Sequence, residues 1–241
     1  MERPRSRRLF FAGTDTDVGK TYVAALAVSE LLHLGRNVAV YKPVASGCDP
    51  AADGSGQRIS SDAVALWEAS GRRGDLHAVC PQRFLAPLAP QAAAIAEGAT
   101  VDEALLVEGL AAVIDGADIA VIEGAGGLLS PLSRTLLNSD VAAKLDADLI
   151  IVAANRLGVI HQVLATVLAA KALRLPVLGI VLNCVSNDAD ASVLSNASTI
   201  ASFTKVPILA DVKYGDTQTG IDWSTLPTLE RKPPDFAQAW L

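Results

Sequence analysis

Cysteine is scarce in this chain of 241 residues, and its few cysteines are not spaced for shared chemistry. The three, Cys48, Cys80 and Cys184, are odd in number and include no Cys-x-x-Cys pair. This pattern excludes a disulfide framework and gives no indication of a zinc site. We therefore expect a reducing, cytoplasmic setting for the protein.

Positive charge is also sparse, since the net charge is −6. A nucleic-acid or anionic-membrane surface needs clustered Lys and Arg, so neither partner is expected. The basic cluster made by Arg3, Arg5, Arg7 and Arg8 is short, and we expect a solvated basic tail over residues 1–7. The apolar run that follows is too short for a signal peptide. Longer apolar runs carry Asp, Arg or Lys at short intervals, so no membrane span is expected.

Two common catalytic patterns are missing. His33, His77 and His161 lie in unrelated contexts without a nucleophile motif, so no Ser-His-Asp triad is indicated. The glycines of Gly124-Ala125-Gly126-Gly127 lack the spacing of a dinucleotide fingerprint and the acid about twenty residues further on.

Apolar residues are plentiful, at 51% of the chain, and they form strand-like runs that alternate with helical patterns. This alternation predicts an α/β fold with a mostly parallel sheet and helices on both faces. The length fits one domain over residues 1–241. The expected strands cover residues 9–13, 37–41, 119–122, 149–152, 177–182 and 206–209, and the expected helices run to about Leu34, from about Ser60, and over 101–116 and 159–173.

Three segments have little apolar periodicity. Residues 45–61 are rich in Ser, Gly, Asp, Pro and Ala and predict a loop. Residues 80–98 contain three prolines and predict irregular structure before a short helix. Residues from about 215 to 241 contain three more prolines and predict an irregular C-terminal tail.

The first expected strand leads into Gly13-Thr14-Asp15-Thr16-Asp17-Val18-Gly19-Lys20-Thr21, which indicates a phosphate-binding loop. In such a loop, backbone amides converge on phosphate oxygens at the start of a helix. Lys20 would contact the β- and γ-phosphates and the Thr21 hydroxyl would bind magnesium. The first glycine of the usual spacing is replaced by Thr14, with Gly13 one residue earlier. The pattern still favours a P-loop NTPase-like fold.

Polar residues follow other strands, where ligands of a parallel sheet bind. Lys42 follows the second strand and Asn183 the fifth. Glu123 ends the third apolar run, where a magnesium-nucleotide site needs an acid. Asp62 is ambiguous, because an acid in the first turn of a helix is stabilised by the helix dipole without any function.

Together these motifs resemble the dethiobiotin synthetase family. The resemblance covers about residues 8–212 and includes the loop at 13–21, Tyr-Lys-Pro-Val-Ala-Ser-Gly at 41–47, Ser-Asp-Ala at 61–63, Glu-Gly-Ala-Gly-Gly-Leu-Leu-Ser-Pro-Leu at 123–132 and Asn183. It implies an ATP- and magnesium-dependent cyclo-ligase that closes a cyclic urea from diaminopelargonic acid and carbon dioxide (or bicarbonate) in biotin synthesis. A homodimer with substrate between the subunits is also implied.

The resemblance implies roles for individual residues. Lys20, Lys42 and Thr16 would be catalytic, and Thr21, Asp62 and Glu123 would bind magnesium. ATP would be bound by Asp17, Val18, Gly19, Lys20, Thr21, Glu123 and Asn183. The diamine would be bound by Thr16, Lys42, Ser46, Gly158, Val159 and Ile160, the last three through helix amides offered to the neighbouring subunit.

The chain departs from the family pattern at His161-Gln162, at Lys213 and at Gln91. Two alternative functions are considered, the first sharing this loop and the second sharing the fold and the phosphate chemistry. A partitioning or septum-positioning ATPase carries a lysine where this chain has Asp15, and a cobyrinic acid-type amide ligase usually carries an additional glutaminase domain.

Overall fold

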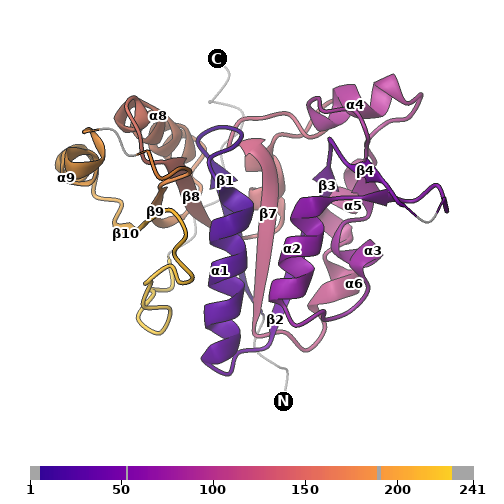
Figure 1. Cartoon of the computed structure of the whole chain (residues 1–241), viewed down its shortest axis with the longest axis horizontal. Helices are drawn as coiled ribbons and strands as arrows, with labels where there is room; N and C mark the ends of the chain where they lie inside the picture. Colours follow the sequence, from indigo (N-terminus) through magenta and orange to yellow (C-terminus); the bar gives the residue numbers. More distant parts are fainter. Residues whose placement is uncertain (1–5, 53, 189–190, 230–241) are drawn as a thin grey trace.

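The centre of the protein is a six-stranded sheet in which every neighbouring pair of strands is parallel (Figure 1). The computed structural model describes residues 6–229 except 53 and 189–190. The strand order is β10-β9-β8-β1-β7-β2, which places β1 in the interior of the sheet. The strands are β1 (Arg7–Gly13), β2 (Val38–Tyr41), β7 (Ile119–Gly127), β8 (Asp148–Ala154), β9 (Val177–Asn183) and β10 (Ile208–Val212).

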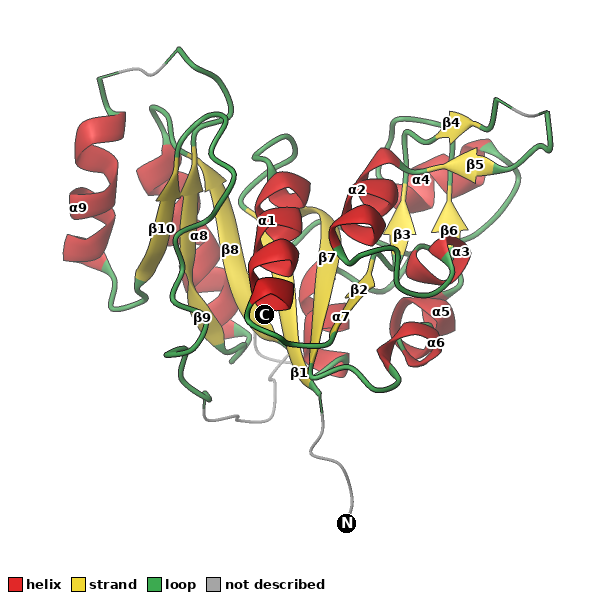
Figure 2. Cartoon of the chain, turned by 60° about the horizontal axis from the view of Figure 1, so that its bottom comes forward, coloured by secondary structure: helices red, strands yellow, loops and turns green. Residues whose placement is uncertain are grey.

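Helices cover both faces of this sheet. Leu9 and Phe11 of β1 pack into one apolar cluster with α1 (Lys20–His33) and α2 (Ser61–Ala69). Phe10 and Ala12 point to the other face and share a cluster with α7 (Asn138–Lys144). A third cluster is covered by α8 (Val159–Ala172) and α9 (Val193–Phe203). The α/β fold with a mostly parallel sheet and helices on both faces is confirmed (Figure 2).

Small elements extend the fold beyond β2. Strand β3 (Val44–Ala45) pairs with β6 (Gln82–Arg83), and β4 (Asp49–Pro50) pairs antiparallel with β5 (Arg58–Ile59). The prediction of a loop over residues 45–61 was therefore wrong in part. Such two-residue strands are fixed by backbone pairing and are too short to show apolar alternation in the sequence. Helices α3 (Leu76–Val79) and α4 (Pro90–Ala96) follow.

The expected helix over 101–116 is divided into α5 (Glu103–Glu108) and α6 (Ala111–Ile114). Where α5 ends, the hydroxyl of the buried Tyr41 donates to the Leu105 carbonyl. A Cβ at Gly109 would lie 2.3 Å from that hydroxyl oxygen. The tyrosine therefore occupies the space beside the last turn of α5.

The third apolar run also differs from its prediction, because β7 does not end at Ile122. It continues through Glu123 to Gly127, and Glu123 and Gly127 pair with Phe11 and Gly13 of β1 across a register shift. Glu123 is therefore a strand residue. Glycines have no side chain that would prevent this close approach to the first strand.

Both ends of the described chain are packed against the sheet. Arg7 begins β1, although we expected it in a tail, and its guanidinium lies 3.1 Å from the buried Asp148 carboxylate. Arg3 and Arg5 lie outside the described residues. Residues 213–229 contain no helix or strand, yet Ile221 and Trp223 are buried in the α1 cluster. Among the described helices, none has the length and apolar character needed to cross a membrane.

Candidate active site

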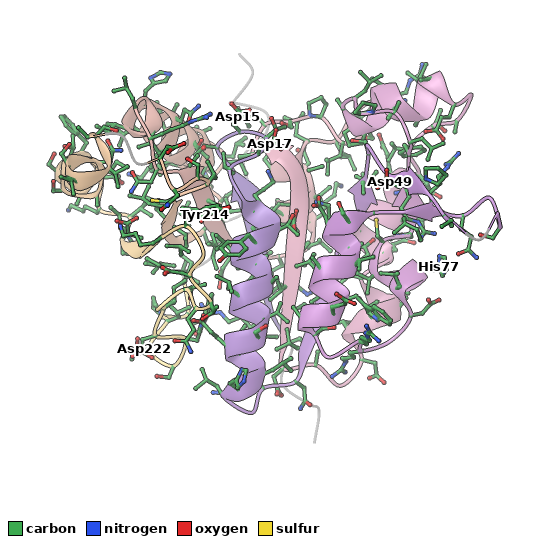
Figure 3. The ribbon with its side chains drawn as sticks, in the orientation of Figure 1. Asp15, Asp17, Asp49, His77, Tyr214 and Asp222 are labelled. Carbon is green, nitrogen blue, oxygen red and sulfur yellow. The ribbon has the colours of Figure 1, made fainter. Side chains whose placement is uncertain are left out.

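The loop between β1 and α1 depends on two glycines. A Cβ at Gly13 would lie 2.4 Å from the Asp15 carbonyl oxygen, and Gly19 has a left-handed φ of 81°. Lys20 Nζ donates to the Asp15 carbonyl oxygen at 3.1 Å, so the lysine folds back over the loop. Figure 3 shows Asp15 and Asp17 at this end of α1. The loop has the tight turn and the helix N-terminus that phosphate binding requires.

Four further side chains meet beside Lys20. Thr21 Oγ1 donates to Glu123 Oε1 at 2.9 Å. Lys42 Nζ donates to the same Glu123 oxygen at 2.5 Å and to Asp62 Oδ2 at 2.8 Å. Glu123 is fully buried and Lys42 is 2% exposed. The structure thus brings together residues that the sequence had placed after separate strands and in the first turn of a helix.

Burial and ion pairing act in opposite directions on these groups. Burial lowers the pKa of Lys20, and Glu123 only partly offsets that effect. Burial would also lower the pKa of Lys42, but the carboxylates of Glu123 and Asp62 outweigh it and raise the pKa. Burial raises the pKa of Glu123. Burial would raise the pKa of Asp62 as well, but Lys42 beside it lowers the pKa. Lys42 therefore compensates two carboxylates at once.

The cluster has the donor atoms that suit magnesium. A hydroxyl and two carboxylates are hard oxygen ligands, and Mg²⁺ is commonly held by one or two carboxylates together with substrate phosphates. Glu123 Oε2 is buried and has no hydrogen-bond partner within the described chain. No group of three His, Cys, Asp or Glu side chains that could hold a metal occurs among the described residues. A metal here would therefore need oxygens from Thr21 and from a bound phosphate.

Asn183 is the last residue of β9 and lies under the phosphate-binding loop. Its Nδ2 donates to the Val18 carbonyl oxygen at 3.0 Å, while its buried Oδ1 has no partner within the described chain. A Cβ at Gly19 would lie 2.1 Å from Asn183 Nδ2. The asparagine therefore supports the loop and keeps one acceptor for a ligand.

A cavity of about 780 Å³ connects these groups. Among the residues expected to act, it is lined by Thr16, Asp17, Gly19, Lys20, Thr21, Lys42, Ser46, Asp62, Glu123 and Asn183. Val18 is buried behind the loop and contributes the carbonyl already described. The volume suits a ligand larger than a single phosphate.

Sequence reasoning missed part of the cavity wall. Tyr22, Val185, Tyr214 and Gly215 also line it. Tyr22 directly follows the Gly-Lys-Thr motif, and an aromatic residue at this position is a sequence signal that could have been recognised. Tyr214 and Gly215 belong to a segment without periodicity, so the sequence contained no sign of where they would pack.

Gly158, Val159 and Ile160 are not part of the cavity wall of this chain. Gly158 precedes α8 with a φ of 93°, and a Cβ there would meet no atom of the described residues within 4 Å. The first amides of a helix lack intrahelical acceptors, so this terminus can bind a group from outside.

The three departures from the family pattern have different surroundings. Lys213 Nζ donates to Asp211 Oδ2 at 2.5 Å. The side-chain amide of Gln91 is buried, and neither its oxygen nor its nitrogen has a partner among the described residues. His161 lies exposed in the first turn of α8.

Comparison with known proteins agrees with this geometry. A family model described as an AAA domain matches residues 7–220. An ATP-dependent dethiobiotin synthetase of Rhodopirellula baltica is 45% identical over 214 residues, covering 85% of this chain and 83% of the relative. A protein of the same name from Bacillus subtilis is 35% identical, covering 84% and 85%.

A similar fold occurs among solved structures. The signal recognition particle receptor FtsY of Elizabethkingia anophelis matches with a TM-score of 0.51 at 16% identity, covering 95% of this chain and 63% of that one. At this identity the similarity shows the fold alone, and it supports the P-loop NTPase-like architecture.

Proposed function

Because the chain belongs to the ATP-dependent dethiobiotin synthetase family, we propose that it closes a cyclic urea on diaminopelargonic acid, using carbon dioxide and magnesium-ATP. A carbamate forms on one amine of the diamine, with loss of a proton. A carbamate oxygen then attacks the γ-phosphorus, and ADP leaves. The second amine attacks the carbonyl carbon of this carbamic-phosphoric anhydride, and phosphate leaves as the ring closes.

The cations of the cavity suit this reaction, because negative charge gathers on phosphate oxygens. Lys20 would contact the β- and γ-phosphates. Lys42 pairs with Glu123 and Asp62 and lines the same cavity as Ser46, and there it would stabilise the transferring phosphoryl group. Thr21, Asp62 and Glu123 would hold magnesium, which supplies positive charge to the phosphates when bound.

Thr16 and Ser46 line the same cavity as Lys42 and would bind the reacting end of the diamine and its carbamate. Gly158, Val159 and Ile160 do not line it. We therefore propose that they bind the distant carboxylate of a diamine held by a neighbouring subunit, in a homodimer. The open position of Gly158 supports this role, because a bound carboxylate needs room beside the helix amides.

The observation that carries the proposed function is the convergence of Lys20, Thr21, Lys42, Asp62 and Glu123 on one cavity. The test is to incubate the protein with magnesium-ATP, labelled bicarbonate and diaminopelargonic acid. We expect ADP release that depends on the diamine, with one labelled dethiobiotin formed per ADP. ADP release stimulated by DNA, or by glutamine with a corrin, but not by the diamine would instead favour one of the two alternative functions.

A further inference from the structure

Residues 213–229, which we call the C-terminal strap, run beside α1 (Figure 3, from Tyr214 to Asp222). Tyr22, Leu26 and Glu30 of α1 are spaced four residues apart, so they lie on one face of the helix. This face is the one turned toward the strap. The Tyr22 hydroxyl donates to the Asp216 carbonyl oxygen. Leu26 packs against the cluster that contains Ile221 and Trp223. Glu30 completes the row.

Among the described residues, the side chain of Glu30 makes four hydrogen bonds, all to the strap. Its Oε1 accepts from the amides of Thr219 at 2.7 Å and Gly220 at 3.3 Å. Its Oε2 accepts from Thr219 Oγ1 at 2.5 Å and from Trp223 Nε1 at 2.7 Å. An ionised carboxylate has about four acceptor positions, and here the strap fills them. This many contacts to one side chain fix the strap on α1.

The first residues of the strap reach the cavity. Tyr214 and Gly215 line it, as does Tyr22 on the facing surface of α1. They share the cavity with Asn183, whose Oδ1 has no partner within the described chain. The helix face that binds the strap therefore also contributes Tyr22 to the cavity that Asn183 lines.

We propose that Glu30 is a positioning residue for nucleotide binding, which acts by holding the strap so that Tyr214 and Gly215 form the wall against the base and ribose. This inference rests on the proposed function, because it requires a nucleotide in the cavity. Glu30 itself does not line the cavity. Its effect on affinity must pass through the strap, and it must depend on the base end of the ligand.

The test measures equilibrium binding of two probes, ADP and inorganic tripolyphosphate, to the wild-type protein and to Glu30→Gln. Glutamine has the same shape, but its NH₂ group cannot accept from the strap donors. We expect the Kd for ADP to rise about tenfold, which corresponds to about 1.4 kcal/mol. The Kd for tripolyphosphate should stay unchanged, because that probe has no base or ribose that could contact Tyr214 and Gly215.

Two further variants complete the experiment. Thr219→Val keeps the shape of the side chain and removes the hydroxyl that donates to Glu30, so it should weaken ADP binding in the same direction by a smaller factor. Glu108→Gln is the matched control, because Glu108 is an exposed glutamate at the end of α5. It should leave both constants unchanged. Near-ultraviolet circular dichroism checks folding, and Thr219→Val still tests the strap if Glu30→Gln does not fold, because Thr219 does not line the cavity.

The outcomes separate the possible failures. If Glu30→Gln lowers the unfolding midpoint but binds ADP as tightly as wild type, the strap is merely structural and the inference is overturned. Equal weakening for ADP and tripolyphosphate would overturn it as well, because the effect would then lie in the phosphate loop. If the wild-type protein binds neither probe, the proposed function itself fails.

Discussion

Replacement of Lys42 by methionine should destabilise the protein, and the loss should grow as the pH rises. Methionine has a similar length and no charge, so Glu123 would remain fully buried without its cation. Removal of one partner of a buried ion pair costs about 3–5 kcal/mol. Asp62 also loses its partner, but its side chain is 43% exposed, so water compensates much of that loss.

The pH dependence follows from the carboxyl group of Glu123. Its pKa is already raised above the ordinary value of 4.5 in the folded protein. A raised carboxyl pKa contributes stability that is fully present below the unfolded pKa and is lost as the pH rises through the folded pKa. Without Lys42, burial acts on this carboxyl group without an opposing cation, so its folded pKa rises further. The pH range over which stability is lost then extends toward neutral pH.

Guanidinium unfolding at pH 5 and pH 8 measures this effect. Lys42→Met should be destabilised more strongly at pH 8, and the exposure of the Asp62 side chain to water keeps its share of this difference small. The double variant Lys42→Met/Glu123→Gln should recover most of the stability at pH 8 and lose the pH dependence. Equal destabilisation at both pH values, or no recovery in the double variant, would refute the reasoning.

Four other predictions concern the site. Lys20→Ala should lower turnover on the order of a hundredfold or more with an unchanged circular dichroism spectrum, and wild-type turnover would contradict its assignment to phosphate. Asp62→Asn should raise the magnesium concentration needed for half-maximal activity, measured by ADP release. Gly19→Ala should lower both the unfolding midpoint and ATP affinity, because the new Cβ is strained at φ 81° and would lie 2.1 Å from Asn183 Nδ2. Gly158→Trp should raise the KM for the diamine more than the KM for ATP. Sedimentation should show a dimer for the wild-type protein. An active monomer would contradict the proposal that two subunits share the site.

Much of the fold could be predicted, because buried parallel strands read as continuous apolar runs. In a parallel sheet the residues that follow the strands lie at one edge. This rule predicted that Lys42, Glu123 and Asn183 lie close together, and they line one cavity. Asp62 could not be decided from sequence, since its helix position alone explains an acid. Its contact with Lys42 Nζ and its place in the cavity wall show that it belongs to the cluster.

The contacts that could not be predicted are those between irregular segments and partners distant in the sequence. The C-terminal tail was predicted to be irregular, and its described part does lack helices and strands. Nothing in its prolines indicated that Thr219 and Trp223 would bind Glu30 of α1. Residues 230–241 of that predicted tail lie outside the described residues. Contacts of this kind are individual side-chain hydrogen bonds, and they produce no periodic pattern in the sequence.

The interior position of β1 has a consequence for how the chain folds during synthesis. Phe11 pairs with Glu123 of β7 on one side and with Ile150 of β8 on the other. Both partners come from the second half of the chain, so the first strand leaves the ribosome long before either edge can be covered. Pairings so distant in sequence slow folding, and exposed strand edges favour aggregation in the interval. A nascent chain that has not yet reached Asp148–Ala154 should therefore depend on chaperones more than the finished protein does.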